Sequence, residues 1–264
     1  MDKPIIIKRP VYTYDRGTFI SKSEKVVTEY PLTIQIHGEE FATVVCTPKE
    51  LEEMVVGFLA SEGIIRMYDK DVKSLSIDEG RGMAYVTLNH KPDVSLHLHS
   101  KRFIGSCCGN SRQSFYFHHD VRTAKTSLST ITVSAESCFQ LMESLQQHSD
   151  VFKETGGVHS AAICNSSTLL VMRSDIGRHN ALDKLYGYCL MNKISVRDKI
   201  LVFSGRISSE VLLKAAKIGI GIVLSKSAPT NLALEMAEEL NMTTVGFIRG
   251  TRMNIYTHPE RIVV

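Results

Sequence analysis

Two adjacent cysteines, Cys107 and Cys108, are the residues of this sequence whose types and spacing best suit covalent chemistry. They stand among glycines, serines and an asparagine in residues 105–111, a composition that predicts an accessible loop. Lys101 and Arg112 flank this loop, and nearby cations favour the thiolate form of a cysteine over the thiol. A thiolate in such a loop is a nucleophile that can accept sulfur and pass it on.

Other roles remain open for this cysteine pair. A free cysteine is often a small buried hydrophobic residue. The two thiols could also form a vicinal disulfide, or bind zinc together with His118 and His119, although zinc-binding cysteines are usually separated by roughly two to four residues. The adjacency of the thiols, the polar neighbours and the glycines favour sulfur chemistry over these alternatives.

A glycine pair, Gly156 and Gly157, stands before a predicted strand that begins at His159. Glycine lets the backbone approach a ligand closely, so this segment is a candidate binding site. The alternative for His159 is a histidine whose hydrogen bonds are satisfied within the core.

The start of a predicted helix carries six polar groups, among them Arg178, which follows a glycine and suits an anion at the helix N-terminus. His179 and Asp183 share a face one turn apart, so the carboxylate can orient the imidazole. Asn180 and Lys184 form a parallel pair on the same helix. The alternative is an ordinary solvated helix face.

Two further strand-to-helix turns place hydroxyl groups and a cation after a strand: the first contains Ser204 and Arg206, the second Ser227. Both could hold phosphate, although ordinary capping by Ser208 or Thr230 would use the same backbone amides. In an open α/β sheet ligands bind outside the carboxyl ends of the strands. We therefore expect the three turns to line one crevice.

The segment 247–252 ends a predicted strand with an aromatic ring and two guanidinium groups, which can stack on a base and pair with phosphates. Surface salt bridging is the alternative role for these cations. The candidate binding residues of this segment are Phe247, Ile248, Arg249, Gly250, Thr251 and Arg252.

The elements that must position these groups fall into two parts. The first hundred residues predict a small α/β roll, and the second half predicts alternating helices and strands in an α/β layer structure. The first part contains strands at 24–36, 41–46, 72–77, 83–88 and 94–98, and a helix capped by Thr47 and Pro48 that ends at Gly63. The second part contains helices at 134–148, 175–192, 208–218 and 230–240, and strands at 159–164, 168–173, 199–203, 221–224, 243–247 and 253–256. The predicted domains are residues 1–120, which end in the cysteine-bearing loop, and 121–264.

Composition and charge bound the class of protein. Of the 264 residues, 43% are hydrophobic and 22% charged, as in an ordinary globular chain. The formal net charge of +3 is too small to indicate nucleic-acid binding, but it suits an anionic small molecule. The sequence shows no export signal, no apolar run of about 18 residues and no dense cysteine spacing. We therefore expect a cytoplasmic protein that neither spans a membrane nor binds nucleic acid.

Several long blocks resemble the formate dehydrogenase accessory sulfurtransferase (FdhD) family, and the resemblance covers nearly the whole chain. The blocks are Glu29-Tyr30-Pro31-Leu32, Gly57-Phe58-Leu59 with Glu62-Gly63-Ile64-Ile65, Thr155-Gly156-Gly157 with His159, Asp175 to Asp183, Ser204 to Glu210, and Ser227-Ala228-Pro229-Thr230.

The resemblance implies a sulfurtransferase with a cysteine persulfide intermediate. Such a protein takes persulfide sulfur from a cysteine desulfurase and passes it to the bis-molybdopterin guanine dinucleotide molybdenum cofactor, before formate dehydrogenase receives that cofactor. The resemblance also implies a homodimer, a second domain similar to the cytidine deaminase fold, and contact between the guanine nucleotide and residues 247–252. A non-catalytic chaperone that binds the molybdenum cofactor is the alternative function.

The cysteine loop departs from the pattern of the family. Members typically carry Cys-Gly-x-Cys-Gly, whereas this chain has Cys107-Cys108-Gly109. An ungapped match on Ser106-Cys107 makes Cys107 the persulfide carrier, and a match on Cys108-Gly109 makes Cys108 the counterpart of the second family cysteine. We rank Cys107 first and Cys108 second.

The residues argue against hydrolytic deaminase chemistry. Zinc deaminases need His-x-Glu and Pro-Cys-x-x-Cys for the metal and the proton shuttle. Here His159-Ser160-Ala161 lacks the glutamate, and the sequence contains no Pro-Cys-x-x-Cys.

Overall fold

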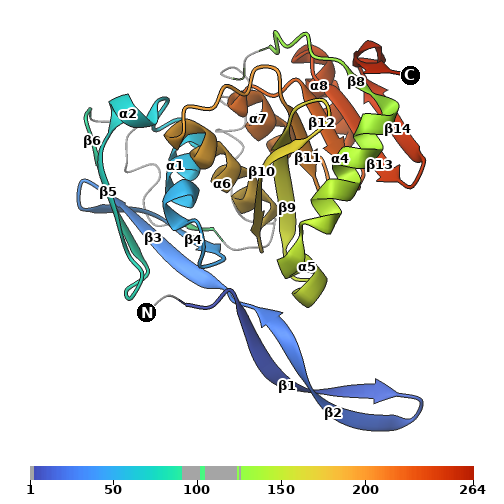
Figure 1. The fold of residues 1–264 in the computed structure, drawn as a ribbon. Helices are drawn as coiled ribbons and strands as arrows, with labels where there is room; N and C mark the ends of the chain where they lie inside the picture. The colour runs from blue at the N-terminus through green and yellow to red at the C-terminus, as the bar shows by residue number, and fades with distance from the viewer. Residues whose placement is uncertain (1–2, 91–101, 105–123, 125) are drawn as a thin grey trace.

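Residues 3–90, 102–104, 124 and 126–264 are described in the computed structural model of the chain (Figure 1). Among these residues, two large sheets of five and six strands have helices packed against them. This mixed α/β architecture confirms the predicted fold class. The likeness to cytidine deaminases stays a prediction, and the predicted domain boundary at residue 120 lies outside the described residues. No described helix is both long and apolar enough to cross a membrane.

The five-stranded sheet, in the order β5-β6-β3-β4-β7, forms from strands with alternating burial. In β3 (Tyr30–Ile36) every second side chain is buried, which is the pattern of a strand with one face on a core. The predicted hairpin with β4 (Glu39–Cys46) is confirmed, as is the β5–β6 hairpin. The other elements here are α1 (Leu51–Ser61), α2 (Tyr68–Asp71), β5 (Val72–Asp78), β6 (Met83–Leu88) and β7 (Arg102–Ile104). The predicted strand at 94–98 lies outside the described residues.

The start of α1 differs from the prediction. Glu50, in the left-handed region with φ of 47°, precedes the first helical residue, and neither Thr47 nor Pro48 caps the helix. Thr47 is buried instead, and its backbone N–H and its Oγ1 hydroxyl donate to Oδ2 of Asp175 at 2.8 and 2.9 Å. The prediction was wrong because a partner distant in sequence engages the threonine that could have closed the helix locally.

Residues 24–36 do not form one strand. Strand β2 (Thr18–Val27) pairs antiparallel with β1 (Ile6–Asp15) in a separate two-stranded hairpin, and β3 begins after a break at Thr28. The Oγ1 of Thr28 donates to the carbonyl of Pro4 at 2.7 Å, which closes the base of the hairpin. The alternation of side chains continues across the break, so it could not reveal that the chain leaves one sheet and enters another.

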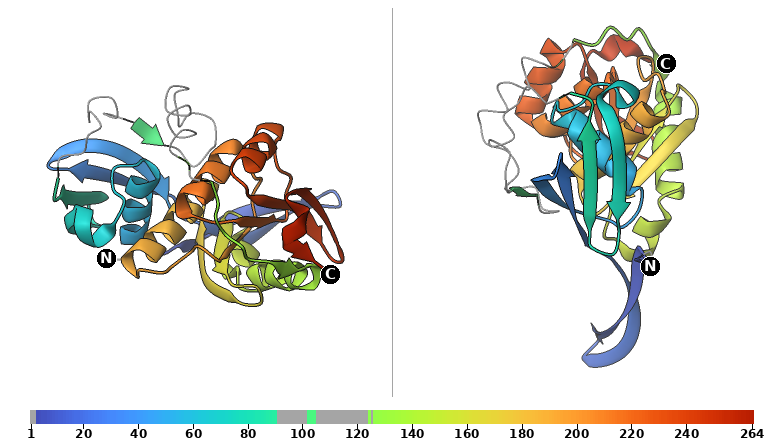
Figure 2. Two further views of the ribbon diagram at one scale, coloured as in Figure 1. Left: turned by 90° about the horizontal axis from the view of Figure 1, so that it is seen from above. Right: turned by 90° about the vertical axis from the view of Figure 1, so that its left-hand side faces the viewer.

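The six-stranded sheet has the order β10-β9-β11-β12-β13-β14. Helix α4 packs on one face of this sheet, and α6, α7 and α8 pack on the other (Figure 2). Alternate residues of β11 point to opposite faces of the sheet. Leu201 and Phe203 pack in the core with α6 and α7, whereas Ile200 and Val202 pack in the core with α4. A strand buried on both faces reads as a continuous apolar run, as this one does.

The predicted elements of the second half are present within about two or three residues of their expected ends. The bounds of these elements are α4 (Ala135–Gln147), β9 (His159–Cys164), β10 (Leu169–Asp175), α6 (Arg178–Met191), β11 (Ile200–Phe203), α7 (Ser209–Ile218), β12 (Ile222–Ser225), α8 (Asn231–Glu239), β13 (Thr243–Arg249) and β14 (Arg252–Thr257). Four short elements were not predicted: β8 (Val133–Ser134), α5 (Asp150–Thr155), η2 (Pro259–Arg261) and β15 (Ile262–Val263).

Helices α1 and α6 join the two parts of the molecule, and they lie side by side in Figure 1. Their backbones approach so closely that a Cβ on Gly57 would stand 1.7 Å from the carbonyl oxygen of Asp183. A Cβ on Gly187 would stand 1.9 Å from the carbonyl oxygen of Glu53. Glycine is therefore required at both positions, because no side chain fits between the two backbones.

We predict that Gly57→Ala destabilises the protein by about 3 kcal/mol, because overpacking against backbone forces the two helices apart. The shift in the urea midpoint of unfolding measures this change. Glu52→Ala, at an exposed position of the same helix, should leave the midpoint nearly unchanged. Equal midpoints for Gly57→Ala and the wild type would contradict the close helix contact.

Candidate functional site

The carboxyl ends of β10, β11, β12 and β13 meet at one edge of the six-stranded sheet, and β9 begins at that edge because it runs in the opposite direction. His159 pairs with Asp175 at the end of β10. On the other side of β9, the backbone N–H of Ser160 donates to Oγ of Ser204 at 2.9 Å. The three predicted turns and the glycine-rich segment thus lie along one edge, which we call the carboxyl edge.

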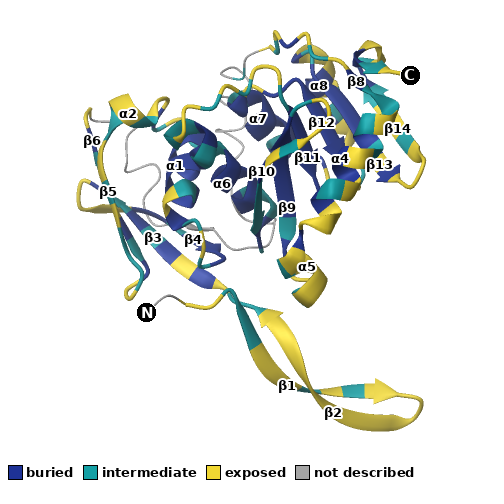
Figure 3. Ribbon diagram, viewed as in Figure 1, coloured by how far each residue is buried: buried dark blue, intermediate teal, exposed yellow. Residues whose placement is uncertain are grey.

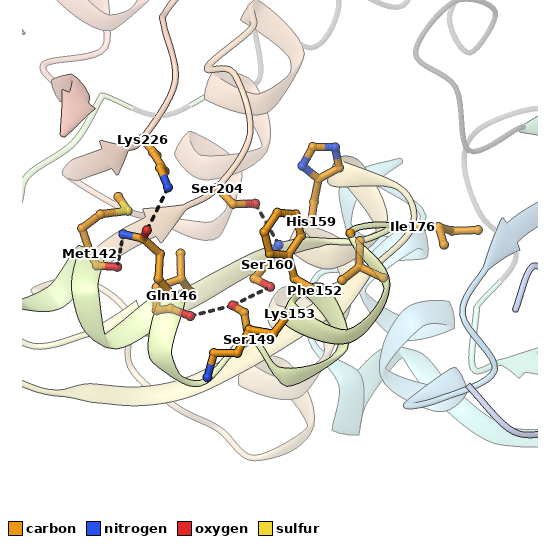
Figure 4. A pocket seen from close by; sticks show the side chains of 14 residues that line it. Met142, Gln146, Ser149, Phe152, Lys153, His159, Ser160, Ile176, Ser204 and Lys226 are labelled. Carbon is orange, nitrogen blue, oxygen red and sulfur yellow. Dashed lines mark hydrogen bonds between the residues drawn. The ribbon is translucent and has the colours of Figure 1, made fainter. Parts of the chain in front are cut away.

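A pocket of about 570 Å³ opens at the carboxyl edge, between the sheet and helices α4 and α5 (Figure 4). Four predicted site residues line it: Gly156, Gly157, His159 and Ser204. The rest of the lining is Met142, Leu145, Gln146, Ser149, Phe152, Lys153, Val158, Ser160, Ile176 and Lys226. Sequence reasoning missed the contribution of α4 and α5. An exposed aromatic beside a lysine, Phe152-Lys153, just before the glycine pair was the available signal.

The pocket combines an apolar wall with a few polar groups. Met142, Leu145 and Val158 are buried side chains of the wall. At the rim, Nζ of Lys226 donates to Oε1 of Gln146 at 2.8 Å. Two lysines, Lys153 and Lys226, beside an apolar wall suit a ligand that is partly apolar and partly anionic.

His159 is half-buried at this edge, and burial lowers the pKa of its imidazole, an effect that Asp175 partly opposes. The depressed pKa favours the neutral ring at neutral pH. A neutral imidazole can donate or accept a hydrogen bond but adds no positive charge.

A second group of predicted residues lies on the other side of the carboxyl edge, at the starts of α6 and α7. Nε of Arg178 is buried and has no hydrogen-bond partner among the described residues. The pKa of Arg178 is lowered, first by burial and then by the charge of Arg206. Glu210 partly opposes this effect, so the cluster holds two guanidinium groups and one carboxylate, and the buried Nε of Arg178 is a donor without an acceptor among the described residues.

His179 is not oriented by Asp183, contrary to the prediction. Nε2 of His179 lies 3.2 Å from Oε2 of Glu210 on α7. Asp183 is buried, and its carboxylate accepts hydrogen bonds from Lys214 at 2.5 Å and from Oγ of Ser61 at 2.6 Å. The helix positions share a face as expected, but neighbouring elements supply closer partners to both side chains.

Asn180 and Lys184 serve the junction between the two parts of the chain and not a binding site. Nζ of Lys184 lies 2.8 Å from Oδ2 of Asp175, both side chains are fully buried, and Lys184 also donates to Oγ1 of Thr47 at 2.7 Å. The amide of Asn180 donates to the carbonyl of Val45 and to Asp175, each at 2.8 Å. These residues are therefore neither a solvated helix face nor a ligand-binding cluster.

The remaining predicted residues continue the carboxyl edge toward β13. Oγ of Ser227 donates to the carbonyl of Ser204 at 3.2 Å, and the N–H of Phe247 donates to the carbonyl of Ser227 at 3.3 Å. Phe247 is partly exposed, and Cζ of Arg249 lies 5.8 Å from its ring centroid. Ile248 is buried in the core beside α4, which leaves only its backbone for a ligand. Gly250 and Thr251 form the turn between β13 and β14, followed by Arg252, and none of residues 247–252 lines the pocket.

Capping accounts for one of the two turns. Oγ of Ser208 accepts a hydrogen bond from the N–H of Val211 and caps α7, whereas the side chain of Thr230 makes no such bond to α8. The side chains of Ser204, Arg206 and Ser227 cap neither α7 nor α8.

The cysteine pair, Cys107 and Cys108, lies outside the described residues, as do His118 and His119. The other four cysteines, Cys46, Cys138, Cys164 and Cys189, are free and buried. Burial raises the pKa of the Cys46, Cys138 and Cys164 thiols to about 12 and that of Cys189 to about 11. No group of three potential metal ligands occurs among the described residues.

The described residues define a mixed α/β protein with two large sheets and a pocket at the carboxyl edge of the six-stranded sheet. The chain belongs to the FdhD/NarQ family, whose model matches residues 27–263. The sulfur carrier protein FdhD of Halalkalibacterium halodurans is 62% identical, over 100% of this chain and 97% of its own length. The sulfur carrier protein FdhD of Bacillus subtilis is 57% identical, over 99% of each chain. A crystal structure of a candidate formate dehydrogenase accessory protein from Desulfotalea psychrophila matches with a TM-score of 0.80 and 24% identity, over 98% of this chain and all of that one.

We predict that the four buried cysteines resist alkylation in the folded protein. At pH 8 a thiol with a pKa of about 11 or 12 is almost entirely protonated, and only the thiolate reacts. Mass spectrometry of peptides after brief treatment with iodoacetamide should find these four cysteines unlabelled, and should find them labelled after denaturation. Labelling of Cys46 at the rate of an exposed thiol would show that the junction opens in solution.

Proposed function

We propose that this chain is a sulfurtransferase that carries sulfur as a cysteine persulfide for the maturation of formate dehydrogenase. Its relatives named as sulfur carrier proteins cover the whole chain at more than half identity, which supports the general role. In the proposal a cysteine desulfurase donates the sulfur, Cys107 or Cys108 holds it, and the bis-molybdopterin guanine dinucleotide molybdenum cofactor receives it as a substrate.

The observation that carries the proposal is the position of β7. This strand runs parallel to β4, with Ile104 beside Val44. Three residues beyond Val44, Thr47 bonds to Asp175 at the end of β10. Cys107 follows Ile104 by three residues in the sequence. The cysteine-bearing segment therefore starts beside the carboxyl edge, where a ligand would meet it.

The loading step is a thiol–persulfide exchange. The thiolate of the loop cysteine attacks the outer sulfur of the donor persulfide, a new sulfur–sulfur bond forms, and the donor cysteine leaves as a thiolate. No electrons are gained or lost in this exchange. The donor only needs access to one loop thiol, since the four buried cysteines are protonated and shielded.

The charges and shapes along the carboxyl edge fit a guanine dinucleotide. Arg178 and Arg206 can pair with phosphate oxygens, and the unpartnered Nε of Arg178 is a donor in need of an acceptor. The partly exposed ring of Phe247 can stack on a base. A chaperone that only binds the cofactor is the second candidate function, because all these residues stand outside the cysteine loop.

We predict that incubation with a cysteine desulfurase and cysteine adds one reducible sulfur atom to the intact protein. Mass spectrometry should show that this gain is lost in Cys107→Ala and kept in Cys108→Ala. Loss in Cys108→Ala alone would reassign the carrier and leave the function in place. If the wild type never gains sulfur from an active donor, the carrier function fails and the binding chaperone becomes the better account.

We also predict that the double variant Arg178→Gln/Arg206→Gln binds guanosine diphosphate about 10- to 100-fold more weakly, the usual loss for charge-assisted hydrogen bonds. Isothermal titration calorimetry measures the affinity. Arg197→Gln is the matched control, because Arg197 is exposed in the loop before β11, at the opposite edge of the sheet. Unchanged affinity in the double variant would remove the arginine pair from the binding site, whatever the outcome for sulfur loading.

A further inference from the structure

Helices α6 and α7 pack on the same face of the six-stranded sheet, and most of each helix is buried, as the dark colour in Figure 3 shows. Two contacts between charged or titratable side chains join the helices. Nε2 of His179 on α6 lies 3.2 Å from Oε2 of Glu210 on α7. One turn further along both helices, Nζ of Lys214 lies 2.5 Å from Oδ1 of Asp183. Together the two contacts fix α6 and α7 relative to each other.

The two contacts differ in their access to a ligand. Asp183 and Lys214 are buried, and Oγ of Ser61 on α1 also donates to Asp183. The side chains of His179 and Glu210 are 19% and 31% exposed. Because both helices begin at the carboxyl edge and these two residues lie in the first turns, their contact lies at that edge. Glu210 can therefore act on a ligand that binds there.

Glu210 shares this part of the edge with the arginine pair. Arg178 is the residue before His179, and Arg206 lies in the turn that leads into α7, four positions before Glu210. Nε of Arg178 is buried and has no acceptor among the described residues. Burial and the charge of Arg206 lower the pKa of Arg178, and the charge of Glu210 opposes this effect. The carboxylate therefore acts on the same cation that a phosphate would meet.

A carboxylate in this place has opposite effects on the free protein and on a bound anion. In the free protein it offsets part of the repulsion between the two guanidinium groups. A bound phosphate carries charge of the same sign as the carboxylate and is repelled by it. Helix stabilisation is the alternative role, because an acidic side chain in the first turn interacts favourably with the helix dipole. That role predicts a loss of stability without Glu210 and no gain in affinity for an anion.

We infer, on the basis of the cofactor binding in the proposed function, that Glu210 weakens the binding of phosphate to Arg178 and Arg206 so that the protein releases its cofactor. The contact with His179 keeps the carboxylate beside the arginines while the ligand is bound, so the repulsion persists in the complex. A protein that passes its cofactor on needs fast dissociation, whereas one that stores it does not. Glu210 thus sets the lifetime of the complex and takes no part in the sulfur chemistry.

The test is the affinity and the dissociation rate of guanosine diphosphate, measured by isothermal titration calorimetry and by stopped-flow displacement of a fluorescent analogue. We expect Glu210→Gln to bind guanosine diphosphate about 5- to 10-fold more tightly, mainly through slower dissociation, because one partly screened repulsion is removed. The gain should shrink at high salt, which screens the charges. Glu210→Ala removes the same charge and should also bind more tightly. Glu239→Gln is the matched control, because Glu239 is exposed at the end of α8, at the opposite edge of the sheet.

Equal or weaker binding by Glu210→Gln, or by Glu210→Ala where Glu210→Gln does not fold, would overturn the inference. Circular dichroism establishes folding, and loss of the fold in both variants would instead assign Glu210 to the stability of α7 and overturn the inference as well. A gain in affinity that persists undiminished at high salt would do the same, since its cause would not be electrostatic. If neither the wild type nor the variants bind guanosine diphosphate, the inference fails together with the arginine pair as a phosphate site.

Sulfur loading, measured on the same samples, separates this inference from the carrier function. A wild type that gains sulfur, combined with unchanged affinity in Glu210→Gln, contradicts the inference alone. A wild type that gains no sulfur from an active donor, combined with tighter binding by Glu210→Gln, contradicts the carrier function alone.

Discussion

The contact between the backbones of α1 and α6 is the constraint on which the rest of the structure depends. Gly57 and Gly187 remove the side chains that would hold the helices apart. Helix α1 packs against the five-stranded sheet, whose strand β7 precedes the cysteine-bearing segment in the sequence. Helix α6 starts at the carboxyl edge. The close contact therefore sets the distance between the end of β7, after which Cys107 and Cys108 follow in the sequence, and the carboxyl edge. Loss of either glycine would act on both at once.

Buried charges fix the register of that contact. Lys184 with Asp175, and Lys214 with Asp183, place two ion pairs at the junction with hydrogen bonds from Thr47 and Ser61. Burial of charge is costly unless every group is paired, and removal of one partner from such a pair costs about 3–5 kcal/mol. A shifted packing of the helices would leave several charges unpaired. The network thus favours one arrangement of the two parts over others, although it adds little net stability compared with apolar packing.

The sequence predicts the helices and strands of the fold better than it predicts the roles of individual polar residues. Strands β9 to β13 and helices α4 to α8 follow from periodicity, because burial repeats along each element. Thr47, Asp183 and Lys184 were open to misassignment, since a cap, a catalytic pair and a buried junction need the same residue types. What separates these roles is the partner, and each partner lies more than thirty positions away or on another element. The α4–α5 side of the pocket was missed for a different reason, since its one signal, Phe152-Lys153 before the glycine pair, is too weak to predict a binding site.

The carboxyl edge separates two groups of candidate binding residues. The apolar pocket with Lys226 lies on the side of α4, whereas Arg178 and Arg206 lie at the starts of the helices on the other face. A Cβ on Gly205 would stand 3.4 Å from Nδ1 of His159, which lines the pocket. A single phosphate would need only one of these groups. A ligand with separate apolar, aromatic and phosphate parts would use both, since it can cross the edge beside His159 and place its reactive end toward the start of the cysteine-bearing segment. The proposed dinucleotide cofactor would meet this requirement, whereas a small anion would not.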